Sequence, residues 1–288
     1  MNKGSSMSLE VVSASSLWVG NYRRRMKVSL ERMYENALDW AHLPFLHSSA
    51  FSSIDLIDSG DWGWRADLGL AQRPEGGEPP HITLQLSLDR TNRRWISSTL
   101  EGPGAGSEIW THVFEFGPRD LEIQADFFIP GVTEVDRAAT GAVYAALYQG
   151  LYDEDEAMML ERQRAIDEQA GPEEKIEVSQ LDDFALGRVS SLDANLPFDF
   201  RYEGQPWRLI RDEEAWLVYT LTCPHLLGSF KDAVIESGTV TCPWHGYRFS
   251  LRTGECLSGA DCQLPDPPKV IERAGWLYIQ GMTANPEP

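Results

Sequence analysis

The chain has 288 residues, 42% of them hydrophobic, and a formal net charge of −19. This charge argues against nucleic acid or an anionic membrane surface as a partner. No apolar run approaches the roughly 18 residues of a transmembrane helix. The basic run Arg23–Arg25 follows the short apolar patch Leu17–Gly20, which is the reverse of the order in a signal peptide. We therefore expect a cytoplasmic protein that binds neither nucleic acid nor membranes.

The N-terminal half begins with a polar, serine-rich stretch, residues 1–16, which we expect to be a flexible tail. A helical pattern follows from Ser29 to about His47, where apolar residues recur at spacings of three and four. Pro44 lies near the end of this run and should distort or terminate the helix.

Residues 52–130 change to a period of two, with Ile82–Leu88 and Leu121–Phe127 as the clearest alternating segments. Turns rich in glycine and proline separate these segments, so the pattern predicts an antiparallel sheet. Residues 137–170 then form a long helical stretch. Helix, sheet and long helix together predict an α+β domain over residues 17–170, with the sheet curled round the last helix.

The C-terminal part differs in character. Gly171–Lys175 is the expected linker between domains, and residues 176–282 combine short β segments with many prolines and glycines. This composition predicts a small all-β domain, followed by a tail at residues 283–288. The expected strands are Trp207–Arg211, Trp216–Thr220, Val270–Glu272 and Trp276–Ile279.

Two short segments of this C-terminal part each contain one cysteine and one histidine. Cys223-Pro-His225 is followed, after sixteen residues, by Cys242-Pro-Trp-His245. Zinc fingers of the Cys₂His₂ type usually pair cysteine with cysteine and histidine with histidine. Mixed pairs favour a [2Fe–2S] centre in which two cysteines bind one iron and two histidines bind the other. A structural zinc site is the alternative.

The sequences CPHLLG and CPWHGYRF around these pairs closely resemble the Rieske domain, over roughly residues 176–282. Respiratory Rieske proteins usually have an extra cysteine in each loop, and these form a disulfide. Here Gly228 or its neighbours and Trp244 occupy those places, so the resemblance implies the ferredoxin or oxygenase type. The other two cysteines, Cys256 and Cys262, are expected to be free thiols.

A second set of metal-binding residue types lies near the N-terminus, in the segment Asn36–His47. Two histidines and one carboxylate on one face form the Fe(II) site of many oxygenases. His42 and His47 could be such a pair, although two histidines on an amphipathic helix are more often core or capping residues. A third ligand would have to come from elsewhere, and the acidic run 153–156 offers candidates. By itself that run is most often a solvated helix face.

The pattern NxxDxxHxxxxH, followed about a hundred residues later by this acidic helix, resembles the catalytic domain of Rieske non-haem iron oxygenases. The resemblance covers residues 17–170 and implies a helix-grip (START-like) fold. By position it makes His42 and His47 iron ligands and Asp155 the third ligand, with Asp153 or Glu156 as alternatives. It also assigns catalytic roles to Asn36 and Asp39, the latter as the bridge from the cluster ligand His245 to His42. In that family the Rieske domain usually comes first, so the order here is permuted.

This resemblance implies an oxidoreductase that uses O₂ to hydroxylate or oxidatively demethylate an aromatic or other apolar small molecule, as in the catabolism of aromatic compounds. Its cofactors would be a [2Fe–2S] cluster and a mononuclear Fe(II), and its assembly a homotrimer. The sequence contains no GxGxxG nucleotide fingerprint. The electrons would therefore come from a separate NAD(P)H-dependent reductase or ferredoxin.

The alternative is a Rieske electron-transfer or redox-sensing protein whose helix-grip domain only binds a ligand. Aromatic residues on the expected strands could line a substrate pocket, but such residues are more often core. They are Trp62, Trp64, Phe114, Phe116, Phe127 and Phe128.

Overall fold

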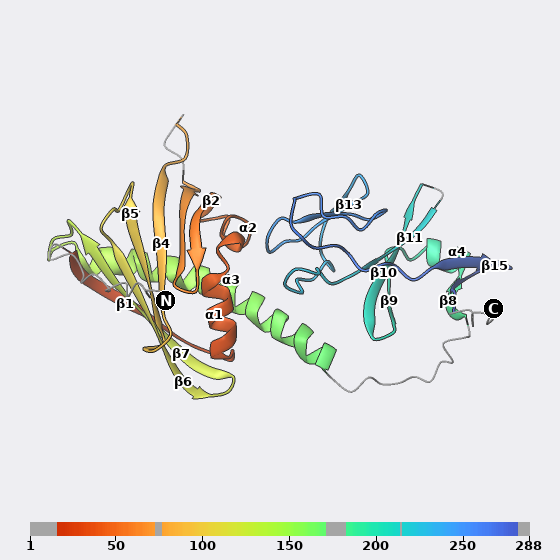
Figure 1. Ribbon diagram of the computed structural model, residues 1–288, viewed down its shortest axis with the longest axis horizontal. Helices are drawn as coiled ribbons and strands as arrows, with labels where there is room; N and C mark the ends of the chain where they lie inside the picture. The colour runs from red at the N-terminus through yellow and green to blue at the C-terminus, as the bar shows by residue number, and fades with distance from the viewer. Residues whose placement is uncertain (1–15, 73–76, 171–182, 214, 282–288) are drawn as a thin grey trace, which may run out of the picture. The chain divides into compact units, whose positions relative to one another are not determined.

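The computed structural model describes residues 16–72, 77–170, 183–213 and 215–281 (Figure 1). The chain divides into two compact units, Met1–Leu160 and Glu161–Pro288. The expected linker at 171–175 and the expected C-terminal tail at 283–288 lie outside the described residues.

The first unit contains one antiparallel sheet of seven strands and a long helix, α3, which begins at Arg137 and ends at Ala170, beyond the boundary of the unit. The strand order in the sheet is β1-β7-β6-β5-β4-β3-β2. The strands are β1 (Ser16–Met26), β2 (Phe51–Gly60), β3 (Gly63–Leu70), β4 (His81–Asp89), β5 (Arg94–Glu101), β6 (Glu108–Gly117) and β7 (Asp120–Pro130). The predicted sheet over 52–130 and the predicted helix over 137–170 are therefore confirmed.

Alternation along the strands places the core on one face of the sheet. In β7, Leu121, Ile123, Ala125, Phe127 and Ile129 are all buried, whereas the residues between them are only half-buried. The main core brings strand residues together with others from the helices: Met33 and Ala37 lie between β1 and β2, and Tyr152 and Met159 lie on α3. Burial of this apolar surface is the main force that holds helix and sheet together.

Strand β1 was not predicted. The flexible tail was expected to extend to residue 16, but Ser16 begins β1, which pairs with β7 at the edge of the sheet. The three consecutive arginines Arg23–Arg25 interrupt the alternation of apolar and polar residues that would have indicated a strand. The structure shows that Met26 and Val19 are buried, while Arg23 and Arg25 pair with acidic side chains of β7 or its turn.

The predicted single helix from Ser29 to His47 is in fact three short pieces: α1 (Leu30–Leu38), a 3₁₀ turn η1 (Trp40–His42) and α2 (Leu43–Leu46). The Ser29 hydroxyl accepts a hydrogen bond from the Arg32 N–H and caps α1. The break falls at Asp39, whose φ and ψ are −83° and 78°, and not at Pro44. Proline lies in the first turn of α2, where its missing N–H is harmless.

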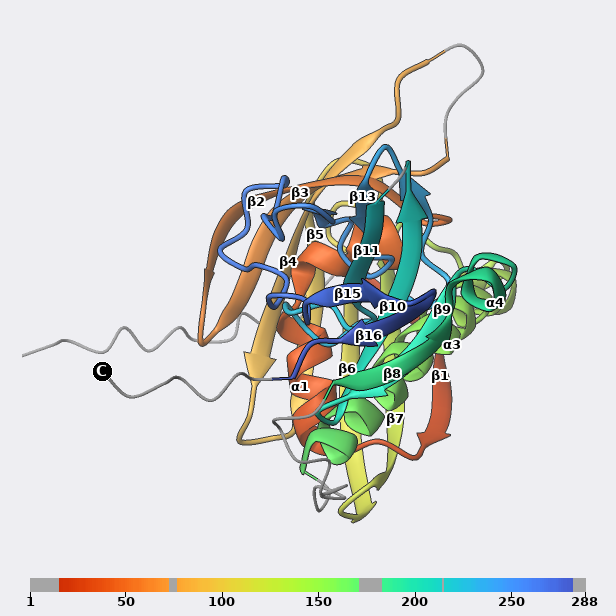
Figure 2. The ribbon, with the colours of Figure 1, turned by 90° about the vertical axis from the view of Figure 1, so that its right-hand side faces the viewer.

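The second unit is built from small sheets, as expected (Figure 2). Three sheets of three strands have the orders β11-β10-β9, β12-β13-β14 and β15-β16-β8. The strands are β8 (Phe184–Arg188), β9 (Phe198–Tyr202), β10 (Gln205–Asp212), β11 (Ala215–Thr220), β12 (Ile235–Glu236), β13 (Thr239–Thr241), β14 (Arg248–Ser250), β15 (Val270–Arg273) and β16 (Trp276–Ile279), with a short helix α4 (Val189–Asp193). All four strands predicted for this region are present.

Among the described helices, none combines the length and the apolar character needed to cross a membrane.

Candidate functional site

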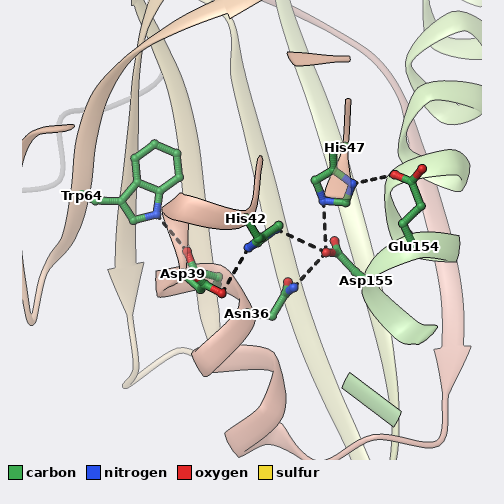
Figure 3. Close-up of polar contacts among 8 residues, drawn as sticks. Asn36, Asp39, His42, His47, Trp64, Glu154 and Asp155 are labelled. Carbon is green, nitrogen blue, oxygen red and sulfur yellow. Dashed lines mark hydrogen bonds and ion pairs between the residues drawn. The ribbon is translucent and has the colours of Figure 1, made fainter. Parts of the chain in front are cut away.

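Two histidines and an aspartate converge between α3 and the segment that follows α1 (Figure 3). His42 ends the 3₁₀ turn, His47 caps the C-terminus of α2, and Asp155 projects from α3. Asp155 Oδ1 lies 3.1 Å from His47 Nε2 and 3.5 Å from His42 Nε2. One donor atom from each residue lies within 4.8 Å of the others, and all three residues are at least nine-tenths buried.

Asn36 and Asp39 surround this group, as their place in the motif implied. Asn36, on α1, donates its side-chain N–H to Asp155 Oδ1 at 2.8 Å. Asp39, at the end of α1, holds Oδ2 at 3.5 Å from His42 Nδ1. The spacing of three residues between Asp39 and His42 predicts a shared helix face, but the two residues do not share one, because the backbone leaves the helix at Asp39.

The electrostatics of the site favour a cation. Burial alone would lower the pKa of His42, but hydrogen bonds to Asp155 and Asp39 raise it to about 9. Burial alone would raise the pKa of Asp155, but hydrogen bonds with His42 and His47 lower it well below its usual range. The site therefore holds a buried carboxylate in its charged form and prefers a positive charge beside it.

Two of the neighbouring acidic residues on α3 face away from the histidines. Asp153 and Glu156 both form ion pairs with Arg24 of β1, the latter at 2.6 Å. Side chains one position apart on a helix differ in direction by about 100°. The Arg24 contacts therefore help to fix the rotation of α3 at which Asp155, and neither of these two residues, points at His42.

Two contacts of the site were not predicted. His47 Nδ1 lies 2.7 Å from Glu154 Oε2, so His47 is held between two consecutive residues of α3. Trp64, on β3, donates its indole N–H to the Ala37 carbonyl at 2.9 Å. This bond satisfies one of the carbonyls that the end of α1 leaves free. No local pattern could identify either partner, because both contacts join elements far apart in the chain.

The donor set suits a mononuclear metal ion. Two imidazoles and one carboxylate on one side of an ion are the protein ligands of non-haem Fe(II) sites, where other positions stay open. His42 and His47 rings meet edge to face, with centroids 5.1 Å apart. Each ring presents Nε2 toward the same oxygen, Asp155 Oδ1.

The aromatic residues considered for a pocket separate into two kinds. Trp64 and Phe127 are buried in the core, at 3% and 0% exposure. Phe114 and Phe116 lie on the exposed end of β6, at 46% and 59% exposure. Trp62 and Phe128 are half-buried.

In the second unit, the two Cys/His segments form loops with the same backbone design. In each loop the cysteine N–H donates to the carbonyl five residues later, Gly228 or Tyr247, at 2.8 Å. In each loop the cysteine carbonyl accepts from the N–H four residues later, and that residue, Leu227 or Gly246, has a φ of 65°. A left-handed residue is what lets so short a loop close.

The loops bring their four candidate ligands together in pairs. Cys223 and Cys242 are fully buried, and their side chains interact with each other. That contact, together with burial, raises the pKa of Cys223, because two adjacent thiolates repel each other. The His225 and His245 rings meet edge to face at 4.6 Å. Two sulfurs on one side and two imidazoles on the other fit a [2Fe–2S] cluster whose irons have different ligands.

Comparison with known proteins supports this assignment. Residues 182–268 match the family model described as the Rieske [2Fe-2S] domain. No curated protein matches the chain.

Several solved structures are similar to one unit or the other. The Zhui aromatase/cyclase from Streptomyces sp. R1128 has 15% identity and a TM-score of 0.40, with 51% of this chain and 95% of that chain covered. A START superfamily protein from Mycobacterium smegmatis has 11% identity and a TM-score of 0.40, covering 48% of this chain and 94% of the other. The ferredoxin of carbazole 1,9a-dioxygenase from Nocardioides aromaticivorans IC177 has 21% identity and a TM-score of 0.30, covering 35% and 98%. The chain combines a helix-grip unit, built from a seven-stranded antiparallel sheet and a long helix, with a Rieske domain that follows it.

Proposed function

We propose that the chain is a Rieske-type oxygenase that uses O₂ to hydroxylate or oxidatively demethylate an aromatic or other apolar small molecule. The observation that carries this proposal is the buried triad of His42, His47 and Asp155 in a chain that also has a Rieske domain. A Rieske domain alone indicates an iron–sulfur electron-transfer module and is typical of oxidoreductases. The triad adds a place where those electrons could be used.

The residues have distinct roles in this proposal. Cys223, Cys242, His225 and His245 would hold the [2Fe–2S] cluster, and His42, His47 and Asp155 would hold a mononuclear Fe(II). When bound, these groups would supply single electrons and activate O₂. Asn36 donates to Asp155 and so restricts that carboxylate to one orientation. Asp39, beside His42 Nδ1, is the residue to which we assign electronic coupling between His42 and the cluster ligand His245.

The proposal includes a separate reductase or ferredoxin as the source of electrons and, as in the family it resembles, a homotrimeric assembly. Burial of the triad fits the proposed chemistry, because a site from which water is excluded protects reactive species. We place the protein in the cytoplasm, where thiols remain available for metal binding.

Substitution of the first histidine tests the proposal. The wild-type protein should hold about three irons per chain, two in the cluster and one mononuclear. His42→Ala should reduce this to about two and abolish substrate-dependent O₂ uptake, while the electron paramagnetic resonance signal of the reduced cluster remains. Iron content measured by emission spectrometry, with an oxygen electrode, provides both values.

If the wild-type protein holds only about two irons and His42→Ala changes nothing, the chain is instead an electron-transfer or redox-sensing protein. If the purified protein contains zinc and no visible absorbance, the cluster assignment fails as well, because Zn²⁺ has no visible absorption.

A further inference from the structure

Glu154 lies outside the triad but contacts one of its members directly. Its Oε2 is 2.7 Å from His47 Nδ1, while Asp155 Oδ1 is 3.1 Å from His47 Nε2. The two carboxylates follow each other on α3, and each engages a different nitrogen of the same ring (Figure 3). The His47 side chain is only 2% exposed, whereas Glu154 is 39% exposed.

This contact determines which nitrogen of His47 is free to bind a metal. A neutral imidazole has one N–H donor and one acceptor nitrogen. A metal ion bound at Nε2 would take the lone pair of that nitrogen, so the one N–H of the neutral ring would have to lie at Nδ1. A carboxylate accepts but does not donate, and Glu154 is placed to accept that N–H. Carboxylates behind ligating histidines commonly fix the tautomer and ring orientation in metal sites.

We propose that Glu154 is a positioning residue that holds His47 in the tautomer and orientation required of a metal ligand. This inference rests on the proposed function, because it requires a metal at the triad. Glu154 differs from its neighbours, since Asp153 and Glu156 both pair with Arg24 on β1.

The test is a titration with Co²⁺ alone, performed on protein that holds its [2Fe–2S] cluster and has an empty mononuclear site. Calorimetry measures the affinity, and the visible bands of bound Co²⁺ report its coordination. We expect Glu154→Leu to weaken binding about 10- to 100-fold and to alter these bands. Glu154→Gln should be less affected, because its amide oxygen still accepts from Nδ1. The matched control Asp167→Asn removes an exposed carboxylate about three turns further along α3 and should bind Co²⁺ as the wild type does.

The outcomes separate the two hypotheses. If His42→Ala and His47→Ala bind Co²⁺ as tightly as the wild type, the triad is not a metal site and the proposed function fails. If those variants lose Co²⁺ but Glu154→Leu and Glu154→Ala bind it normally, only the positioning role is wrong. An equal loss in the control variant Asp167→Asn would also contradict it, because it would indicate a general effect of charge on this helix.

A second feature, independent of the triad, concerns the two cysteines that the cluster does not use. Glu255 and Gln263 form an antiparallel bridge, and the Leu264 N–H donates to the Gly254 carbonyl at 2.9 Å. Cys256 and Cys262 are the next residues on these two segments, directly opposite each other, and the Cys256 side chain influences the pKa of Cys262. Both thiols are free and only partly buried.

The bridge between Glu255 and Gln263 is expected to bring the Cα atoms of Cys256 and Cys262 to a separation that suits a disulfide. Residues directly opposite in an antiparallel pair have Cα atoms about 4.5 to 5.5 Å apart. Disulfides join Cα atoms separated by about 4.4 to 6.8 Å. Cys256 also bridges to Phe249 in β14, just after the second cluster loop. Oxidation would therefore require little movement and would occur close in the fold to that loop.

We infer that Cys256 and Cys262 form a reversible disulfide, a thiol-redox modification site on the Rieske domain. The oxidant would be a low-molecular-weight disulfide such as oxidised glutathione. One thiolate attacks it and releases one reduced thiol, and the second cysteine then displaces the other. Burial and the Cys256 sulfur raise the pKa of Cys262 to about 11.

The experiment equilibrates the cluster-loaded protein with glutathione buffers of increasing oxidised fraction, alkylates the free thiols and maps them by mass spectrometry. We expect one intramolecular Cys256–Cys262 disulfide that dithiothreitol reverses. In Cys256→Ser and Cys262→Ser, the remaining cysteine should instead carry glutathione or stay free. If both thiols remain free under fully oxidised glutathione, or link only between chains, this inference is wrong.

Discussion

His42 shows how its surroundings change the chemistry of one side chain. A histidine on an amphipathic segment is by default a core or capping residue, and the sequence alone favoured that reading. The structure places it, 3% exposed, between Asp39 and Asp155. Two carboxylates outweigh the cost of burying a charge, so the metal-free histidine holds a proton at neutral pH.

The pKa of His42 predicts how metal binding depends on pH. Below pH 9, a metal ion must displace the proton from His42, so its apparent affinity should rise about tenfold per pH unit between about pH 7 and 9. Above about pH 9 the affinity should level off. Co²⁺ titrations against a competing chelator would measure this. In Asp39→Asn the plateau should begin at a lower pH, and an affinity independent of pH in the wild type would contradict the prediction.

Asp39 itself carries a second prediction at this scale. We expect Asp39→Asn to keep its full iron content, because it contributes no atom to the triad, but to lower substrate-dependent O₂ uptake about 10- to 100-fold. The measurement compares iron content, the signal of the reduced cluster and O₂ uptake in the variant and the wild type. Normal uptake would exclude Asp39 from electronic coupling, whereas loss of iron would make it a structural support of the site.

At the scale of elements, close backbone contacts position both candidate sites. Helix α3 approaches β1 so closely at Gly141 that a Cβ there would lie 2.3 Å from the Val19 carbonyl oxygen. Its contact with β1, together with the ion pairs of Arg24, places Asp155 opposite the histidines. In the Rieske domain, Gly228 lets the first cluster loop touch Trp244 of the second.

Two glycines of α3 provide a matched test of this packing. Gly141→Ala should destabilise the first unit by about 1–3 kcal/mol, because its Cβ would collide with backbone that has little room to move. Gly150→Ala meets nothing within 4 Å and should stabilise the helix by about 0.5–1 kcal/mol. Urea denaturation of both variants measures the difference. Equal effects from the two substitutions would show that α3 does not pack as closely as described.

The contact between the cluster loops makes a similar prediction. A Cβ at Gly228 would lie 2.9 Å from Trp244 and 3.3 Å from Cys242 Sγ. Gly228→Ala should therefore push the loops apart and lower cluster occupancy, which visible absorbance per chain would report. Gly204→Ala is a control in the same domain, since nothing lies within 4 Å of its Cβ, although its φ of 74° makes it slightly strained. Undiminished cluster content in Gly228→Ala would show that the loops can adjust.

At the scale of the whole molecule, the chain joins a helix-grip unit to a Rieske domain that follows it. Each unit supplies one complete set of candidate ligands from its own residues. The first draws on α3 and the segment after α1, and the second on two loops of the same design. This independence is why His42→Ala is expected to remove one kind of iron and leave the other.

The sequence by itself determined the features that depend on local patterns. Alternation predicted the strands of residues 52–130, and composition predicted the long helix. The mixed pairs Cys223/His225 and Cys242/His245 predicted a [2Fe–2S] centre, and the resemblance of their flanking sequences predicted a Rieske domain. These predictions succeeded because periodicity and ligand spacing reflect short-range geometry. Strand β1 was missed because its arginines are neutralised by partners about a hundred residues away.

Only the tertiary structure decided the features that depend on contacts between distant elements. The acidic run 153–156 offers several carboxylates, and the rotation of α3 against β1 decides that Asp155 faces the histidines while Asp153 and Glu156 face Arg24. The helix break at Asp39 and the contact of Glu154 with His47 were also not predicted from the sequence, and only the structure shows them. A helix places consecutive side chains in different directions, and its neighbours in the fold decide which of them is buried.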